Sequence, residues 1–183
     1  MFMNKDPTKA RNGFFALFMG AALLGEVFGV LSMSLTKTAS GVAFGEPLWL
    51  ALRSFAGTAA YMAVIFFSGF FPIGQPLTFI VMLIRGMGQG AQLSQLYLSY
   101  GTEGLSTVVA VCIPFTVLTA AALSFACIEA AGLSNVYLRH TFTGNAVLGM
   151  KDTVKLYVQR FLLLLAVSVT ASAIQFIFAK IYR

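Results

Sequence analysis

Residues 77–98 read LTFIVMLIRGMGQGAQLSQLYL, a run long enough to cross a bilayer, since a membrane helix needs about 20 predominantly apolar residues. Arg85 lies inside this run, where a guanidinium costs from a few to about ten or more kcal/mol, depending on the method of estimate. A chain keeps such a residue when it has a partner, a water-filled cavity or a route to the membrane surface. Arg85 is therefore predicted to mark a site of assembly or function.

The residues that follow Arg85 favour close packing of this span. Gln89 lies four positions after Arg85 and Gln92 three positions further, which places all three on one face of a helix. Gly86 and Gly90 form a small-xxx-small pair on another face, where helix backbones can approach closely. We therefore expect the third span at the centre of a helix bundle, packed along much of its length.

Composition identifies the class of protein. Hydrophobic residues make up 58% of the 183 residues and charged residues only 10%, whereas a soluble domain carries about a quarter charged residues. The sequence thus predicts an all-α, polytopic integral membrane protein that forms a single domain over residues 1–183. The net charge of +6 is read as membrane topology, and no nucleic-acid partner is expected.

Five apolar segments are predicted to span the membrane. A turn at 71–76, with two prolines and a glycine, separates the second from the third. A short connection is expected at 99–104, and the longest and most polar connection at 133–155. The part of the last connection at about 145–155 has an amphipathic pattern that predicts a helix on the cytoplasmic face. The five segments cover about 14–35, 50–71, 77–98, 105–132 and 156–179.

The basic residues indicate an orientation. Three of them, Lys5, Lys9 and Arg11, precede the first span, and four more lie in the fourth connection and its flank. Because Lys and Arg concentrate in cytoplasmic loops, the N-terminus is predicted to be cytoplasmic, in a multi-pass protein whose main surrounding is the lipid bilayer.

Arg85 requires an anionic partner if it is buried. Glu26 and Glu129 are the acidic residues inside the predicted spans. At 1.5 Å per residue, Glu26 and Arg85 differ in depth by roughly 6 Å, and Glu129 lies shallower but within reach of a long side chain. An ion pair of Arg85 with Glu26 or Glu129 is predicted, with Glu129 slightly favoured.

Motifs for catalysis or metal binding are missing from the sequence. It has no GxSxG, no phosphate-binding Lys-Ser/Thr after a glycine-rich loop, and no paired carboxylates at membrane depth. Cys112 and Cys127 are interpreted as small packing residues, without the spacing of a zinc site. The chain is therefore predicted not to be an enzyme and to need no cofactor or metal.

The segment from about Trp49 to Tyr137 resembles the stage II sporulation protein M family of bacterial membrane proteins. The likeness rests on four groups of residues: Arg53-Ser54-Phe55, the connection from Gly69 through Gly74 and Pro76 to Leu77, the run Arg85-Gly86-Met-Gly-Gln-Gly90, and Ile113-Pro114. The chain departs from the family pattern at Phe115-Thr116, where an amide-bearing residue is common.

The resemblance implies a non-enzymatic scaffold in the bacterial cell membrane. In spore formers the family member anchors a peptidoglycan-degrading complex that drives engulfment of the forespore, and the hydrolases are its partners, stage II sporulation proteins D and P.

The residues themselves leave a second function open, namely a transporter or transporter subunit in which Arg85, Gln89 and Gln92 contact an anionic solute. A water-filled cavity at Arg85 would favour the transporter. Whether the chain forms a homo-oligomer is left open.

Overall fold

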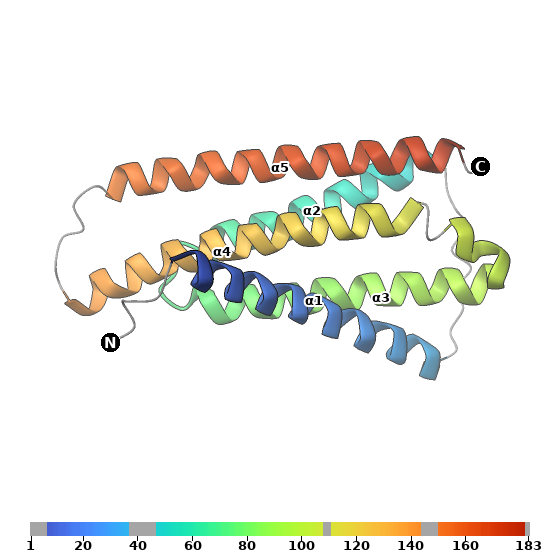
Figure 1. The fold of residues 1–183 in the computed structure, drawn as a ribbon, viewed down its shortest axis with the longest axis horizontal. Coiled ribbons are helices and arrows are strands. Elements are labelled where there is room, and N and C mark those ends of the chain that lie inside the picture. The colour runs from blue at the N-terminus through green and yellow to red at the C-terminus, as the bar shows by residue number, and fades with distance from the viewer. Residues whose placement is uncertain (1–6, 37–46, 108–110, 144–149, 182–183) are drawn as a thin grey trace.

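The computed structural model of this protein describes residues 7–36, 47–107, 111–143 and 150–181. Within these ranges the chain forms five helices and no strand, which confirms the all-α prediction. Consecutive helices run in opposite directions along one long bundle (Figure 1). The helices are α1 (Pro7–Thr36), α2 (Pro47–Ser68), α3 (Gly74–Thr107), α4 (Ile113–Thr143) and α5 (Met150–Ile181).

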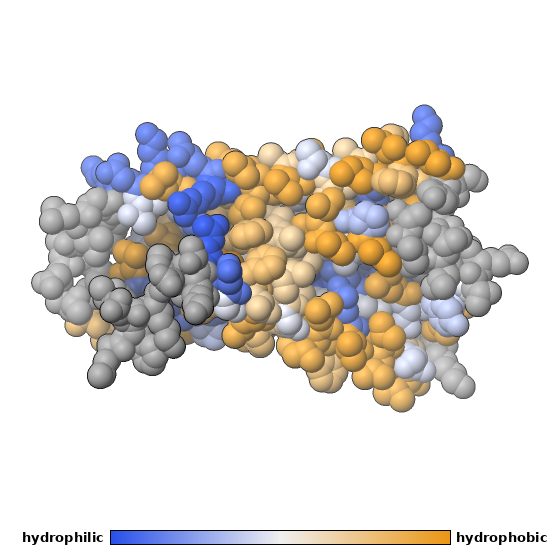
Figure 2. Space-filling view, in the orientation of Figure 1, coloured by the Kyte–Doolittle hydropathy of each residue, from blue (hydrophilic) through white to orange (hydrophobic). Residues whose placement is uncertain are grey.

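Four of the helices are long and apolar enough to cross a membrane. The spans are Arg11–Leu35, Ala51–Ser68, Ile113–Leu138 and Lys151–Ile181. Figure 2 shows hydrophobic residues over the middle of the bundle and hydrophilic residues gathered at the end where α5 begins. The chain is therefore a multi-pass membrane protein. α3 is not among the four spans, because Arg85 and the nearby glutamines and glycines dilute its apolar residues.

Prolines mark the starts of four of the described helices. Pro7 begins α1 and Pro47 begins α2. Pro76 lies in the first turn of α3, and Pro114 is the second residue of α4. A proline is tolerated there because the N–H groups of a first turn have no partner within the helix. The predicted fourth span, 105–132, placed Pro114 inside the helix. In the structure α4 begins only at Ile113 and continues eleven residues beyond 132, to Thr143.

Two predicted connections are largely helical. Residues 133–143 belong to α4, where Leu133 and Ser134 are buried, and the Ser134 hydroxyl donates to the backbone oxygen of Phe71 at 2.8 Å. Residues 99–104 lie within α3, where a kink at Gly101 (φ 59°, ψ −147°) joins two helical segments. Of the predicted amphipathic segment 145–155, residues 150–155 form the start of α5 and 145–149 lie outside the described residues.

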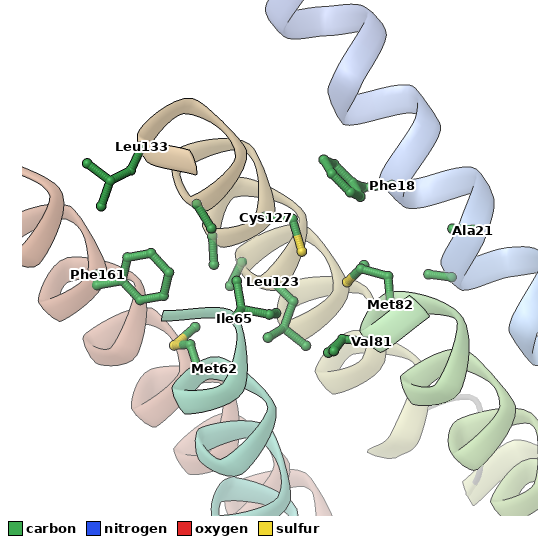
Figure 3. Packing of buried hydrophobic residues seen from close by; sticks show 14 of the residues in the cluster. Phe18, Ala21, Met62, Ile65, Val81, Met82, Leu123, Cys127, Leu133 and Phe161 are labelled. Atoms are coloured by element: carbon green, nitrogen blue, oxygen red, sulfur yellow. The ribbon is translucent and has the colours of Figure 1, made fainter. Parts of the chain in front are cut away.

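The central helix of the bundle is α4, and the prediction that the third span is central is wrong. Among the described residues α4 contacts each of the other four helices, whereas α3 contacts α1, α2 and α4. Small residues on more than one face of α4 let it pack against several helices; Ala120 and Ala122, about 200° apart around the helix, are both buried. In the core, Leu123 and Cys127 of α4 lie among side chains of the other helices, including Met62, Ile65, Met82 and Phe161 (Figure 3).

Candidate functional site

Paired glycines fix α3 against α1. A Cβ at Gly86 would overlap the carbonyl oxygen of Ala22, and a Cβ at Gly90 would overlap that of Glu26. The reciprocal contact involves Gly25 and Gly29 of α1, whose added Cβ atoms would overlap the carbonyl oxygens of Leu83 and Met87. Gly86 and Gly90 were predicted from the sequence as a packing pair. The matching pair on α1 was not predicted, although Gly25-x-x-x-Gly29 has the same spacing.

Arg85 projects away from this glycine contact. Successive residues of a helix are about 100° apart, so Arg85 lies about 100° around α3 from Gly86. Its guanidinium extends between α2 and α4, where Nη2 donates to Oγ1 of Thr58 at 3.4 Å and to Oγ1 of Thr119 at 3.3 Å. It also lies over the ring of Tyr61, with Cζ 5.7 Å from the ring centroid.

Gln89 completes the polar contacts of the guanidinium. With its carboxamide oxygen turned toward Arg85, that oxygen accepts from Nη1 at 2.8 Å and from Nη2 at 3.0 Å. This orientation is assigned from the hydrogen bonds it makes. The four-residue spacing of Arg85 and Gln89 thus brings the two side chains into contact along one face of α3. All of these acceptors are neutral, so none of them balances the charge of Arg85.

The predicted ion pair of Arg85 with Glu129 is wrong, because Glu129 pairs with Arg160 of α5, at 2.6 Å between Oε2 and Nη1. The reason is depth along α4. Arg85 is level with Thr119, which is ten residues, or about 15 Å, from Glu129. In the described ranges Arg160–Glu129 is the one ion pair.

Glu26 does not form an ion pair with Arg85 among the described residues either, although the two groups interact electrostatically. Its backbone packs on Gly90, so it belongs to the glycine face of α3. Arg85 leaves the helix on a different face, toward α2 and α4. Similar depth in the membrane was therefore not sufficient to bring the two side chains together.

Arg85 lines a cavity of about 590 Å³ bounded by α2, α3, α4 and α5. Where it lies, α3 and α5 face each other without packing, since no pair of their described Cα atoms comes within 8 Å. Two arginines line the cavity, and its described lining includes no Asp or Glu. The polar lining residues are Arg53, Ser54, Thr58, Tyr61, Arg85, Gln89, Gln92, Gln95, Cys112, Thr116 and Gln175.

The cavity brings together residues predicted to share one helix face and others that were not predicted to lie near them. Arg85, Gln89 and Gln92, predicted on one face of a helix, line it jointly. Arg53 and Gln175 were not linked to Arg85, because they come from α2 and α5. The signal in the sequence that could have identified Gln175 was its position as a polar residue inside the last apolar span. Cys112 also lines the cavity, so its environment differs from that of Cys127, which is fully buried in the core.

The residues that carry the family resemblance have direct structural explanations. Gly86 and Gly90 allow the backbone contact with α1, and a Cβ at Gly74 would overlap the carbonyl oxygen of Ser68 in the α2–α3 turn. Pro114 begins α4. Comparison of the chain with protein-family models, with curated proteins and with solved structures gives no match. The resemblance to the stage II sporulation protein M family stays a prediction.

Proposed function

We propose that this protein binds a small anionic solute in the cavity at Arg85 and acts as a membrane transporter or a transporter subunit. The observation that carries the proposal is the charge of the cavity wall. Arg53 and Arg85 both line the cavity, and its described lining contains no carboxylate. The electrostatic field inside such a cavity attracts anions.

The environment of Arg85 supports a bound anion rather than a permanently buried ion pair. Its guanidinium contacts neutral hydroxyl and amide oxygens and has no ion-pair partner in the described ranges. Burial of an unpaired charge at membrane depth is expensive, and an anion from solution would relieve it. The volume of about 590 Å³ falls within the range of roughly 300–1,000 Å³ for small-molecule sites.

The cavity extends toward the end of the bundle where α2 and α4 begin. Arg53 lies six residues after the start of α2, and Cys112 directly precedes α4. With the N-terminus in the cytoplasm, as the distribution of basic residues predicts, this end faces outward. In this orientation an anion enters from the outside and reaches Arg85 at the inner end of the cavity.

The two cysteines provide a test of the cavity. Cys127→Ser leaves Cys112 as the reporter in the cavity wall, and Cys112→Ser leaves Cys127 as a matched reporter in the core. A membrane-impermeant maleimide applied from outside should label Cys112 and not Cys127. Gln92→Cys should also react, whereas Ile84→Cys, on the lipid-facing side of α3 at 49% exposure, should not. Small carboxylates or phosphates at constant ionic strength should slow the labelling of Cys112.

Transport is then measured in proteoliposomes with radiolabelled organic anions. Arg85→Met should abolish uptake and anion protection of Cys112, since the variant removes the more buried of the two charges that line the cavity. Arg160→Met is the matched control, because Arg160 carries the same charge but lies outside the described cavity lining and bonds Glu129. If Arg85→Met takes up and binds anions as the parent does, the proposal is wrong.

The scaffold role implied by the resemblance stays a prediction, and it predicts a different accessibility of the residues around Arg85. A scaffold that recruits peptidoglycan hydrolases during sporulation does not require water or solute at Arg85. If Cys112 and Gln92→Cys resist labelling from both sides of the membrane, the cavity proposal fails. Recovery of a cell-wall hydrolase with the purified protein would then favour the scaffold.

A further inference from the structure

Two polar atoms of residues that line the cavity lack a hydrogen-bond partner among the described residues. They are Nε of Arg85, on α3, and Oε1 of Gln175, on α5, and both are buried without a partner in the described part of the chain. Both residues line the same cavity. An unsatisfied buried polar group destabilises a fold, so such groups require an explanation.

Gln175 is the more informative of the two. Its side chain is only 4% exposed, and it lies in an otherwise apolar part of α5, between Ile174 and Phe176. An apolar residue of similar length would avoid the loss of a hydrogen bond at this position. A carboxamide presents both an acceptor and donors, so a hydroxyl group, which donates and accepts, can pair with it in either orientation of the amide.

The two unsatisfied atoms belong to helices that do not touch. Among the described residues α3 and α5 make no backbone contact, and the cavity that both helices line separates them. In the described part of the chain no hydrogen bond joins Arg85 to Gln175. A molecule that satisfies both carries an anionic oxygen for the guanidinium and a hydrogen-bond donor, such as a hydroxyl, for the amide oxygen. Gln92 and Gln95 add two more amides to the same wall.

We infer that the solute is a hydroxylated organic anion, whose charged oxygen binds Arg85 and whose hydroxyl groups bind Gln175 and the glutamines of α3. This inference rests on the proposed function and narrows its substrate class. An inorganic anion would leave Gln175 without a partner. An alkyl carboxylate or alkyl phosphate would place an apolar chain against the amides and remove their access to water.

The test compares hydroxylated anions with matched alkyl anions on the purified full-length protein in nanodiscs. In the carboxylate arm the probes are gluconate and hexanoate; in the phosphate arm they are sorbitol 6-phosphate and hexyl phosphate. Within each pair the charged group and the number of carbons are the same. We expect the hydroxylated member of at least one pair to bind about tenfold or more tightly than its alkyl counterpart, and the arm that shows this identifies the charged group.

Gln175→Met removes the amide and keeps the length of the side chain. It should weaken binding of the hydroxylated probe about tenfold and leave the alkyl probe unchanged, so the selectivity disappears. The same variant should raise the thermal stability of the empty protein, because an unsatisfied polar group has been removed. A residue with a purely structural role would lower the stability instead. Thr170→Val, on the exposed face of α5 and outside the cavity lining, should change neither quantity.

The outcomes separate the inference from the proposed function. If the wild-type protein binds both members of each pair equally, and Arg85→Met still loses binding, the hydroxyl inference is wrong while anion binding stands. If Gln175→Met keeps the full selectivity, the inference is also wrong. If no probe binds, or Arg85→Met binds all probes as the parent does, both the inference and the proposed function fail.

Discussion

Gly90→Ala tests the contact between α1 and α3. An added Cβ would overlap the carbonyl oxygen, carbonyl carbon and Cα of Glu26, all backbone atoms that cannot rotate away. α1 must therefore move away from α3, and packing is lost along their interface. Overfilled packing costs about 1–3 kcal/mol, whereas alanine favours a helix over glycine by about 1 kcal/mol. The expected net effect is a loss of up to about 2 kcal/mol in the free energy of unfolding.

Gly88→Ala is the matched control, two residues away on the same helix. An added Cβ at Gly88 meets no atom within 4 Å, so this variant gains the helix propensity of alanine without the overlap. The difference in unfolding free energy between Gly90→Ala and Gly88→Ala thus isolates the packing cost, which we expect at about 1–3 kcal/mol. A second pair on α1, Gly25→Ala against Gly20→Ala, should repeat the result, since Gly20 also has open space.

The assay follows the reactivity of Cys127 in the Cys112→Ser background. Cys127 is fully buried and becomes reactive when the bundle opens, so its labelling rate across a denaturant series in mixed micelles reports the free energy of unfolding. Circular dichroism is less suitable, because membrane helices persist after their contacts are lost. Equal stability of Gly90→Ala and Gly88→Ala would refute the close approach of α1 and α3.

Three further substitutions test single contacts by the same assay. Tyr157→Phe should lower the unfolding free energy by about 0.5–1.5 kcal/mol, because the hydroxyl donates to the backbone oxygen of Phe66 at 2.8 Å; an unchanged value would contradict this bond. Ser134→Ala should cost a similar amount, since its hydroxyl bonds the α2–α3 turn, and no loss would argue against α4 continuing past that turn. Glu129→Gln should change the stability by no more than about 1 kcal/mol, because its partner Arg160 has a 56% exposed side chain; a larger loss would show that the pair is shielded from solvent.

Local patterns in the sequence predict the helices well because membrane helices satisfy their backbone hydrogen bonds within one segment. The five apolar runs correspond to five helices, and the turn predicted at 71–76 overlaps the connection between α2 and α3. The errors in the predicted helices concern where each helix begins and ends. α4 continues to Thr143, and Leu133 and Ser134 are buried against other parts of the bundle. Leu133, Val136 and Tyr137, spaced three and four residues apart, were the signal for this continuation, but the polar residues between them led to the prediction of a connection.

For Arg85 too, some properties could be predicted from the nearby sequence, and others depended on the tertiary structure. Its type, its depth in an apolar run and its spacing to Gln89 and Gln92 follow from the sequence, and they predicted a polar site on one face of α3. The residues that contact Arg85 could not be predicted from the sequence, because they depend on which helices are neighbours and how those helices are aligned. Thr119 is level with Arg85, while Glu129 is about 15 Å further along α4 and within reach of Arg160.

Composition and periodicity were thus sufficient for the class of protein, the number of helices and the face of α3 that carries polar groups, since each is a property of one segment and its solvent. The tertiary structure alone decided that α4 is central, that α1 covers the glycine face, and that α3 and α5 remain apart. The cavity exists because of that separation. It joins residues from four helices, and no sequence spacing within a single helix encodes their proximity.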